Sequence, residues 1–449
     1  MKQDLTKGPI TKTLLWFALP MTLGNLLQQF YNIADTLIIG RFVGADALAA
    51  VGSSYTLMTF LTSILLGLSM GSGVAVSIAY GKNDTDRLKE NVFLSFAGIA
   101  LAAFLLSLIA FGGIDGILSI LQVPVEIRSL MKRYLLVIFA GIGGTFLYNY
   151  FSCILRAVGN SVAPLWFLGF SAGLNIVLDL LFVLGFHWGV WGAGFATSIS
   201  QWLSGIGLFV YALLRVPELR VEQKHMRWNR QTAGNLCSLS VITSAQQSIM
   251  NFGILMVQGR VNSFGPAVMA AFAAAVKIDS FAYMPVQDFG NAFSTFIAQN
   301  YGANKGERIR TGIRSAVRTS MLFGVLVSAV VCIFARPLMQ IFVGNEEVEI
   351  LRIGAEYLRI EGAFYCLIGL LFLLYGFFRA IEKPGMSVVL TVISLGLRVL
   401  LAYALSAVPA LGVTGIWVSI PIGWLIADIT GVIPMWKFYR ERCGMLKQP

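Results

Sequence analysis

Asp35 is the first of several carboxylates that lie inside long apolar stretches of this chain. It belongs to the segment FYNIADTLIIG at residues 30–40. A charged side chain at the centre of a bilayer costs about 2.5–3.5 kcal/mol on insertion scales, so acids at this depth are candidates for function. The acids that fall well inside apolar runs are Asp35, Asp179, Asp279, Asp288 and Asp428, with Glu361 as a marginal sixth.

The first half of the chain offers polar partners for Asp35. Asn175 and Asp179 are four residues apart, which places them on one face of a helix. Thr197 adds a hydroxyl and Asn149 an amide from two further apolar runs. Because polar groups in lipid must find partners, we expect these side chains to converge with Asp35 inside one helical bundle.

Such a group of side chains could bind a cation. Two carboxyl groups in a water-poor pocket do not both ionise unless a cation joins them. Carboxylate, amide and hydroxyl oxygens suit either H⁺ or Na⁺, and composition does not choose between the two ions. The alternative is a structural polar network that only holds helices together.

Side chains near Asp35 and one methionine in the second half could contact a bound small molecule. The candidates for this substrate or cavity role are Gln28, Tyr31, Asn32, Asn149 and Met256. Polarisable and aromatic side chains suit promiscuous sites, although such residues at helical positions also serve simply as packing.

The second half lacks a counterpart of Asp35 and carries a different set of charges. We describe this set as the C-lobe charge network, consisting of Lys277, Asp279, Asp288, Arg398 and Asp428. These residues could neutralise one another as ion pairs, or they could take part in transport. The predicted cation site is therefore confined to the first half.

Pro20 lies fifteen residues before Asp35 in the same apolar run. A proline inside a helix removes one backbone hydrogen bond and permits a kink. We expect Pro20 to act as a hinge, with a static kink as the alternative.

The composition places all these residues in a membrane protein. Of the 449 residues, 57% are hydrophobic and 12% charged, against about 25% charged in a soluble domain. Twelve apolar runs are long enough to span a bilayer as helices. They lie at about 12–39, 47–79, 91–114, 130–152, 162–186, 189–214, 235–260, 268–300, 311–335, 353–377, 386–408 and 413–436. The expected fold is an all-α polytopic membrane protein.

The net charge of +11 could suggest nucleic acid as a partner, but the distribution of the charge points to the membrane. With the N-terminus in the cytoplasm, 22 of the 33 basic residues fall in cytoplasmic segments and eight in outer ones. This asymmetry predicts a multi-pass protein of the cytoplasmic (inner) cell membrane with both termini in the cytoplasm. The five cysteines have no metal-binding spacing, and we expect no metal site.

An internal repeat divides the chain into two similar halves. Gly40-Arg41 recurs as Gly259-Arg260, and AYGKNDTDRLKE at 79–90 resembles NYGANKGERIRT at 300–311. The offset grows from 219 to 223 residues, as small insertions would cause. Each copy holds six spans, so the copies are parallel repeats forming two pseudo-symmetric six-helix bundles. The predicted domains are an N-lobe at 1–214, a cytoplasmic linker at 215–234 and a C-lobe at 235–449.

These motifs together resemble the multidrug and toxic compound extrusion (MATE) family, and its DinF-like branch most closely. The likeness covers nearly the whole chain, including ALPMTLGNLLQQFYNIADTLIIGRFVGADALAAVG near the start and LRAVGNSVAP after the fourth span. The resemblance implies twelve helices in two lobes around a central cavity, and export of cationic or amphipathic drugs in exchange for H⁺ or Na⁺. The branch's N-lobe cation site matches Asp35, Asn175, Asp179 and Thr197.

The resemblance also assigns a bending role to the first-helix proline, which matches Pro20. Other branches place acids on the seventh and tenth helices, where this chain has Gln246, Gln247 and the acid-free stretch FYCLIGLLFLLYGFF. That difference counts against a Na⁺ site in the C-lobe.

We therefore expect a monomeric secondary active multidrug exporter that works by alternating access and antiport, without a cofactor. Its partners would be cationic or amphipathic small molecules and the lipid bilayer. One alternative is a lipid-linked oligosaccharide flippase of the same wider superfamily, which would need extra spans or a cationic cavity. An intramembrane enzyme is a further alternative, but it would need Asp-rich Mg²⁺ motifs, which the sequence lacks.

Overall fold

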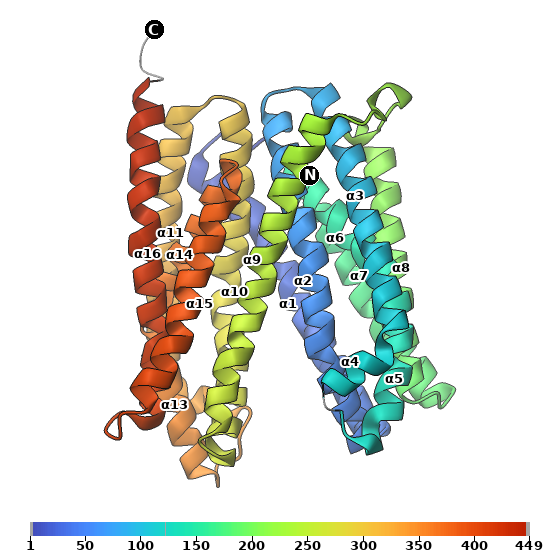
Figure 1. Cartoon of the computed structure of the whole chain (residues 1–449), viewed down its shortest axis with the longest axis vertical. Coiled ribbons are helices and arrows are strands. Elements are labelled where there is room, and N and C mark those ends of the chain that lie inside the picture. Colours follow the sequence, from blue (N-terminus) through green and yellow to red (C-terminus); the bar gives the residue numbers. More distant parts are fainter. Residues whose placement is uncertain (1–2, 122, 446–449) are drawn as a thin grey trace. The chain divides into compact units, whose positions relative to one another are not determined.

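The computed structural model describes residues 3–121 and 123–445, and these residues form helices joined by short connections (Figure 1). No strand occurs in the described part of the chain. The predicted all-α class is therefore confirmed.

Eight helices among the described residues are long and apolar enough to cross a membrane. Two bent helix pairs raise this number to ten when each pair is counted as one span. Two long helices, α1 (Ile10–Phe42) and α9 (Arg230–Asn262), cover the remaining two predicted spans.

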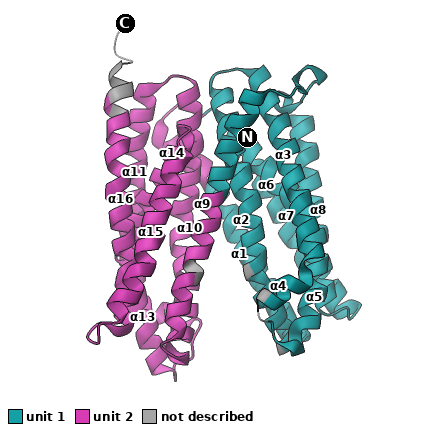
Figure 2. Cartoon of the chain, viewed as in Figure 1, with its two compact units in different colours: residues 1–4, 19–244 teal, residues 5–18, 245–449 magenta. Residues whose placement is uncertain are grey.

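The chain forms two compact units, which Figure 2 colours separately. Unit 1 consists of residues 1–4 and 19–244, and unit 2 consists of residues 5–18 and 245–449. The division in the second half of the chain falls after Ser244, beyond the predicted linker at 215–234, because that linker packs within unit 1. Helices α1 and α9 each contribute residues to both units.

Unit 1 is a bundle built mainly from seven helices and one π-helix. They are α2 (Ala45–Gly81), α3 (Thr85–Gly112), α4 (Ile114–Ile120), α5 (Val125–Ala140), α6 (Ile142–Ala157), α7 (Val162–Asp179), η1 (Leu180–Gly185) and α8 (Val190–Arg215). Apolar side chains from α2, α3, α5, α6 and α8 share one buried core. Within this core the Tyr150 hydroxyl donates to the Val92 carbonyl at 2.7 Å, so its polar atom is satisfied without reaching lipid.

Unit 2 repeats this architecture with seven helices. They are α10 (Pro266–Gly302), α11 (Gly306–Ile333), α12 (Ala335–Gln340), α13 (Val348–Gly362), α14 (Tyr365–Ala380), α15 (Pro384–Ser406) and α16 (Gly412–Met445). Three aromatic rings anchor its core. Trp417 stacks on Phe272 with ring centroids 5.5 Å apart and meets Tyr357 edge-on at 4.9 Å. Such aromatic pairs contribute beyond the area that they bury.

Glycines allow α2 to lie very close to the first part of α9 inside unit 1. A Cβ on Gly67 would lie 2.4 Å from Ser244 Cα, and a Cβ on Gly71 would lie 2.5 Å from the Leu239 carbonyl oxygen. Hydroxyl groups bridge the same contact, since Ser72 and Ser240 are 2.9 Å apart. Small residues of this kind are the usual means of close helix packing in membranes.

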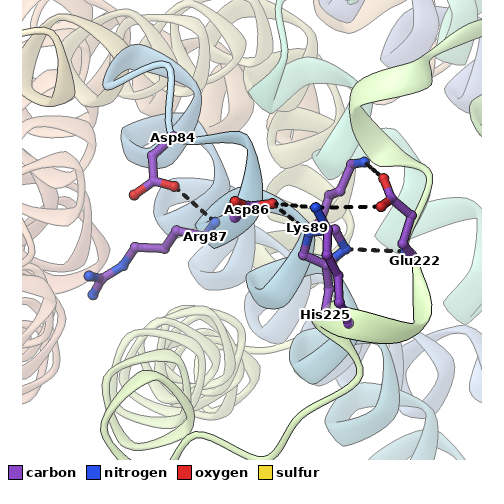
Figure 3. A network of polar contacts seen from close by, with 7 residues as sticks. Asp84, Asp86, Arg87, Lys89, Glu222 and His225 are labelled. Carbon is purple, nitrogen blue, oxygen red and sulfur yellow. Dashed lines mark hydrogen bonds and ion pairs between the residues drawn. The ribbon is translucent and has the colours of Figure 1, made fainter.

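The linker between the halves is fixed to the start of α3 by a network of charged groups (Figure 3). The buried His225 ring bonds Asp86 through Nε2 at 2.7 Å and accepts from the Glu222 backbone N–H through Nδ1 at 3.2 Å. Lys89 donates to Glu222, and Lys224 lies 3.3 Å from Asp86. These contacts hold the linker on unit 1.

The same network shifts the pKa of its exposed members. His225, and then Lys224, lower the pKa of Asp86, and Lys89 lowers the pKa of Glu222. Asp86 in turn raises the pKa of Lys224. Each charged form is favoured by an oppositely charged or donating neighbour.

The N-terminal segment Leu5–Gly8 is held within unit 2 by hydrogen bonds to its backbone, whereas the linker is held through its side chains. Its backbone carbonyls accept hydrogen bonds from side chains at the end of α10, in the short connection that follows and at the start of α11. Asn300 donates to the Leu5 carbonyl at 3.2 Å, and Lys305 donates to the Thr6 carbonyl at 2.8 Å. Arg308 reaches three carbonyls, including that of Gly8 at 2.7 Å.

Candidate cation site

Asp35 of α1 and Asp179 of α7 face each other within unit 1. Their carboxyl groups lie within hydrogen-bond reach of each other. Asp179 is 0% exposed, and the Asp35 side chain is half-buried with its Oδ1 atom inaccessible to solvent. The Oδ1 atoms of both residues have no hydrogen-bond partner within residues 3–121 and 123–445. Two carboxyl groups within hydrogen-bond reach of each other need a proton or another cation between them.

Asn175 connects this acid pair to α8. With its amide oriented to suit both neighbours, it donates to Asp179 Oδ2 at 3.2 Å and accepts from the Thr197 N–H at 3.3 Å. The opposite orientation gives only a 3.4 Å contact with the Thr197 hydroxyl and sets the amide oxygen against the carboxylate. We therefore assign the first orientation. The structure thus brings together all four predicted cation-coupling residues.

Two tyrosines lie beside the acid pair. Tyr31, which the sequence suggested, is one turn before Asp35 on α1 and close enough for its hydroxyl to interact with Asp35 and Gln28. Tyr134 of α5, 7% exposed, lies near both Asp35 and Asp179 and was not predicted from the sequence. The signal that could have identified Tyr134 is its repeat partner, Tyr357.

The other substrate candidates are more dispersed. Asn32 bonds Gln29 at 3.3 Å on its own helix, and Asn149 donates to the Thr145 carbonyl at 3.0 Å within α6. Met256 is 45% exposed and belongs to unit 2. Gln28 is exposed on α1. Of the five candidates, Tyr31 therefore borders the acid pair, and Gln28 lies against Tyr31.

Asp179 occupies a special position in its span. It is the last residue of α7, and the π-helix η1 begins at the next residue. A π-helical turn interrupts the regular backbone hydrogen-bond ladder, and such turns are frequent at functional sites. The carboxylate is therefore placed where the backbone geometry of the span changes.

Pro20 lies inside α1, which continues through it as one helix from Ile10 to Phe42. The chain passes from unit 2 to unit 1 between Ala18 and Leu19, directly before this proline. The predicted hinge thus sits where one helix changes from one compact unit to the other.

The structure brings only part of the C-lobe charge network together. Asp279 and Arg398 belong to one buried cluster in unit 2, whereas Lys277 is exposed. Asp288 is buried nine residues further along α10. Asp428 is 3% exposed, and neither of its carboxylate oxygens has a hydrogen-bond partner among the described residues. Glu361, only a marginal candidate in the sequence, joins the Asp279 cluster.

The site around Asp35 offers carboxyl, amide and hydroxyl groups. Hard oxygen donors of this kind suit a proton or an alkali cation better than a transition metal. Within residues 3–121 and 123–445, no group of three or more His, Cys, Asp or Glu side chains could hold a metal ion. The geometry therefore supports reversible binding of a monovalent cation.

Comparison with known proteins identifies the family. The MatE family model matches residues 20–181 and 240–404. A probable multidrug resistance protein YpnP of Bacillus subtilis is 30% identical over 438 residues, covering 95% of this chain and 94% of that protein. The multidrug export protein MepA of Staphylococcus aureus is 25% identical, with coverage of 95% and 94%.

Solved structures show the same fold. One describes the outward-facing conformation of a multidrug resistance MATE family transporter, with a TM-score of 0.90, 23% identity, and coverage of 99% of this chain and 98% of that one. The family consists of transporters rather than enzymes, and it does not favour the flippase alternative. The family model matches one segment in each repeat, and a relative of near-equal length is 30% identical. This chain is therefore a member of the MATE family of multidrug efflux transporters.

Proposed function

We propose that the protein exports cationic or amphipathic small molecules across the cytoplasmic membrane in antiport with H⁺ or Na⁺, by alternating access. Both termini would lie in the cytoplasm, where the basic residues concentrate, and the working form would be a monomer. The observation that carries this proposal is the Asp35–Asp179 carboxyl pair. Asn175 bonds Asp179 and is itself bonded by the Thr197 N–H.

The acid pair can couple cation binding to conformation. Without a cation, the two negative charges repel each other and each lacks a partner at Oδ1. A proton or a sodium ion between them removes the repulsion and draws α1 toward α7. Since only a ligand that favours one conformation can shift an equilibrium, the cation must bind one state of α1 better than the other.

Substrate and cation can compete because their candidate groups share one segment of α1. Gln28 and Tyr31 lie within two turns of Asp35 on that helix. A change in α1 that brings Asp35 to Asp179 also moves these side chains. Pro20, fifteen residues earlier, provides the weak point in the backbone that such a movement needs.

Transport by the reconstituted protein tests this function. Purified full-length protein in lipid vesicles would be given an imposed pH gradient or an imposed Na⁺ gradient, one at a time, with ethidium as the fluorescent cation. We expect one gradient to drive ethidium movement and vesicles without protein to show none. Ethidium movement that neither gradient accelerates would contradict cation coupling, and the active gradient identifies the ion.

A further inference from the structure

The linker between α8 and α9 has two parts that differ in burial. In the first part, Val216 and Leu219 are buried in the core of unit 1, and Arg220 donates to two backbone carbonyls near the end of α8. In the second part, every residue from 226 to 230 is exposed. We call residues 226–230 the linker tip. The fold therefore buries the first part of the linker and leaves the linker tip at the surface.

The linker tip combines large apolar side chains with positive charge. Trp228 is 80% exposed and Met226 is 52% exposed. Arg227 stands between them in the sequence, and Arg230 follows. Within residues 3–121 and 123–445, neither guanidinium group takes part in an ion pair or a hydrogen bond. Exposed apolar side chains of this size, grouped with polar ones, mark an interaction surface.

The acids of the charged network that holds the linker are already paired. Asp86 is paired with Lys224 and His225. Glu222 is paired with Lys89 and Lys224. The network therefore satisfies its own charges and leaves the two arginines of the linker tip available for a negatively charged partner.

Both ends of the linker tip are fixed. On one side, the buried His225 ring bonds Asp86 at 2.7 Å. On the other side, Asn229 Oδ1 accepts from two backbone N–H groups of the first turn of α9 at 3.0 and 3.2 Å, as a helix cap does. Only three residues separate these two fixed points. Binding through the linker tip therefore orders little additional backbone, which keeps its entropic cost low.

The linker tip lies where membrane-spanning helices begin and end. Helix α8 ends at Arg215, directly before the linker, and α3 begins at Thr85; both helices are long and apolar enough to cross a membrane. In Figure 1 the linker is the green segment at the end of unit 1 where α3 begins and α8 ends. The apolar run of α9 begins at about residue 235, shortly after the linker tip. These neighbours place the linker tip at the level of the lipid headgroups.

The side chains of the linker tip suit a surface of anionic phospholipid. A guanidinium group can donate two parallel hydrogen bonds to one phosphate. Tryptophan is enriched at the membrane interface, where its ring contacts apolar chains and its N–H stays hydrated. A soluble acidic partner would satisfy the arginines alone, whereas a lipid surface at this level also takes up Trp228 and Met226.

We propose that the linker tip is a membrane-docking surface for anionic phospholipids. Arg227 and Arg230 bind lipid phosphates, and Trp228 and Met226 enter the boundary between headgroups and acyl chains. Docking fixes the linker and the start of α9 to the bilayer. In the orientation proposed above, the lipids belong to the cytoplasmic leaflet, whose negative surface attracts basic segments next to spans.

Fluorine NMR of the full-length protein, labelled with fluorotryptophan and placed in lipid nanodiscs, tests this docking. The chain has nine tryptophans, and the Trp228 resonance is identified by its loss in Trp228→Phe. Nanodiscs of phosphatidylcholine alone would be compared with nanodiscs that also contain phosphatidylglycerol. We expect phosphatidylglycerol to reduce severalfold the broadening of the Trp228 resonance by a water-soluble paramagnetic agent, because the ring leaves the water.

Arg227→Gln and Arg230→Gln remove the charges and leave Trp228 in place. Each basic residue close to an anionic surface strengthens association about fivefold. We expect each single variant to weaken the protection by phosphatidylglycerol by about that factor, and the double variant to abolish it. Arg133→Gln is the matched control and should leave the protection unchanged. It removes an exposed arginine of α5, which lies at the opposite end of unit 1 from the linker (Figure 1).

Three results would overturn the proposal. A Trp228 resonance equally broadened in both lipid compositions would show that the linker tip stays in water, available to a soluble partner. Equal protection in phosphatidylcholine alone would show that the ring enters the membrane without recognition of anionic headgroups. Protection reproduced in phosphatidylcholine by soluble glycerol phosphate would identify a site for free anions. None of these measurements uses a gradient or a substrate, so their outcome is independent of the proposed antiport.

Discussion

Asn175 and Asp179, four residues apart on α7, are joined through their side chains, with the amide donating to Asp179 Oδ2 at 3.2 Å. The amide oxygen accepts from the Thr197 N–H, so its orientation is fixed from α8. One carboxylate oxygen of Asp179 is therefore occupied. The other, Oδ1, is left for Asp35 or for a cation.

Replacing Asp35 by asparagine should abolish coupled export without unfolding the protein. The substitution keeps the size of the side chain but removes one of the two charges that bind the cation. We expect gradient-driven ethidium export to fall at least about tenfold, as the loss of a charged hydrogen-bond partner implies. Reconstituted vesicles measure this loss, with Asp46→Asn, an exposed acid at the start of α2, as the control. Undiminished export by the Asp35 variant would contradict the coupling role.

Replacing Asn175 by alanine should weaken cation binding while leaving some transport. The amide's hydrogen bond to a carboxylate is worth about 1.5–3 kcal/mol, which corresponds to about a tenfold to hundredfold change in affinity. We expect half-maximal export to require a correspondingly higher H⁺ or Na⁺ concentration. Gln258→Ala, which removes an amide bonded to Asn262 on its own helix, is the matched control and should leave that concentration unchanged. An equal effect of both variants would argue that Asn175 only supports packing.

Replacing Pro20 by alanine should slow the transport cycle. Alanine restores the missing helix hydrogen bond and stiffens α1 where it passes between the two units. We expect the maximal export rate to fall severalfold while ethidium binding to the purified protein is retained. Pro266 stands at the first position of α10, where proline is well tolerated, so Pro266→Ala serves as the control. A Pro20 variant with the parental rate would identify the proline as a static feature.

The attachment of the linker to α3 should depend on pH in a defined direction. The pKa values of Asp86 and Glu222 are lowered in the folded protein. Their contribution to holding the linker on α3 is therefore fully present above the ordinary carboxyl pKa of about 4, and it is lost as the pH falls through the lowered values. The pKa of Lys224 is raised, so its contribution is lost only as the pH rises beyond about 10.4. The linker should therefore be held most firmly between these limits.

Amide hydrogen exchange of residues 217–229 at neutral pH measures this attachment. We expect Asp86→Asn to increase exchange there several-fold, because His225 and Lys224 lose their shared acceptor. The ion pairs of the network join Lys89, Lys224 and His225 to Asp86 and Glu222. Glu90→Gln, one turn further along α3, removes an acid outside these pairs and should have no effect. If residues 217–229 exchange as slowly in Asp86→Asn as in the parent protein, the linker is held by packing alone.

Replacing Gly71 by alanine should destabilise unit 1. The added Cβ would lie 2.5 Å from the Leu239 carbonyl oxygen and from Ser240 Cα, both backbone atoms that cannot move aside individually. Overpacking of this kind costs about 1–3 kcal/mol. We expect a lower midpoint of thermal unfolding in detergent. Gly98→Ala, where the added Cβ meets no atom within 4 Å, should be neutral or slightly stabilising.

The sequence alone determined the features that depend on local periodicity. Apolar run lengths predicted the membrane-spanning helices, and the four-residue spacing of Asn175 and Asp179 predicted their shared face, because helix geometry fixes both. The internal repeat indicated two similar bundles. Each of these signals is contained within a short stretch of chain or in the comparison of two stretches.

Only the tertiary structure decided which helices meet. Asp35 and Asp179 are separated by 144 positions, and nothing local to either one specifies the other as its partner. In the second half, the same sequence signal, an acid in an apolar run, has different outcomes. Asp279 joins Glu361 and Arg398, whereas Asp428 is buried elsewhere. Packing between distant helices makes this selection, because burial removes water as the alternative partner for each charge.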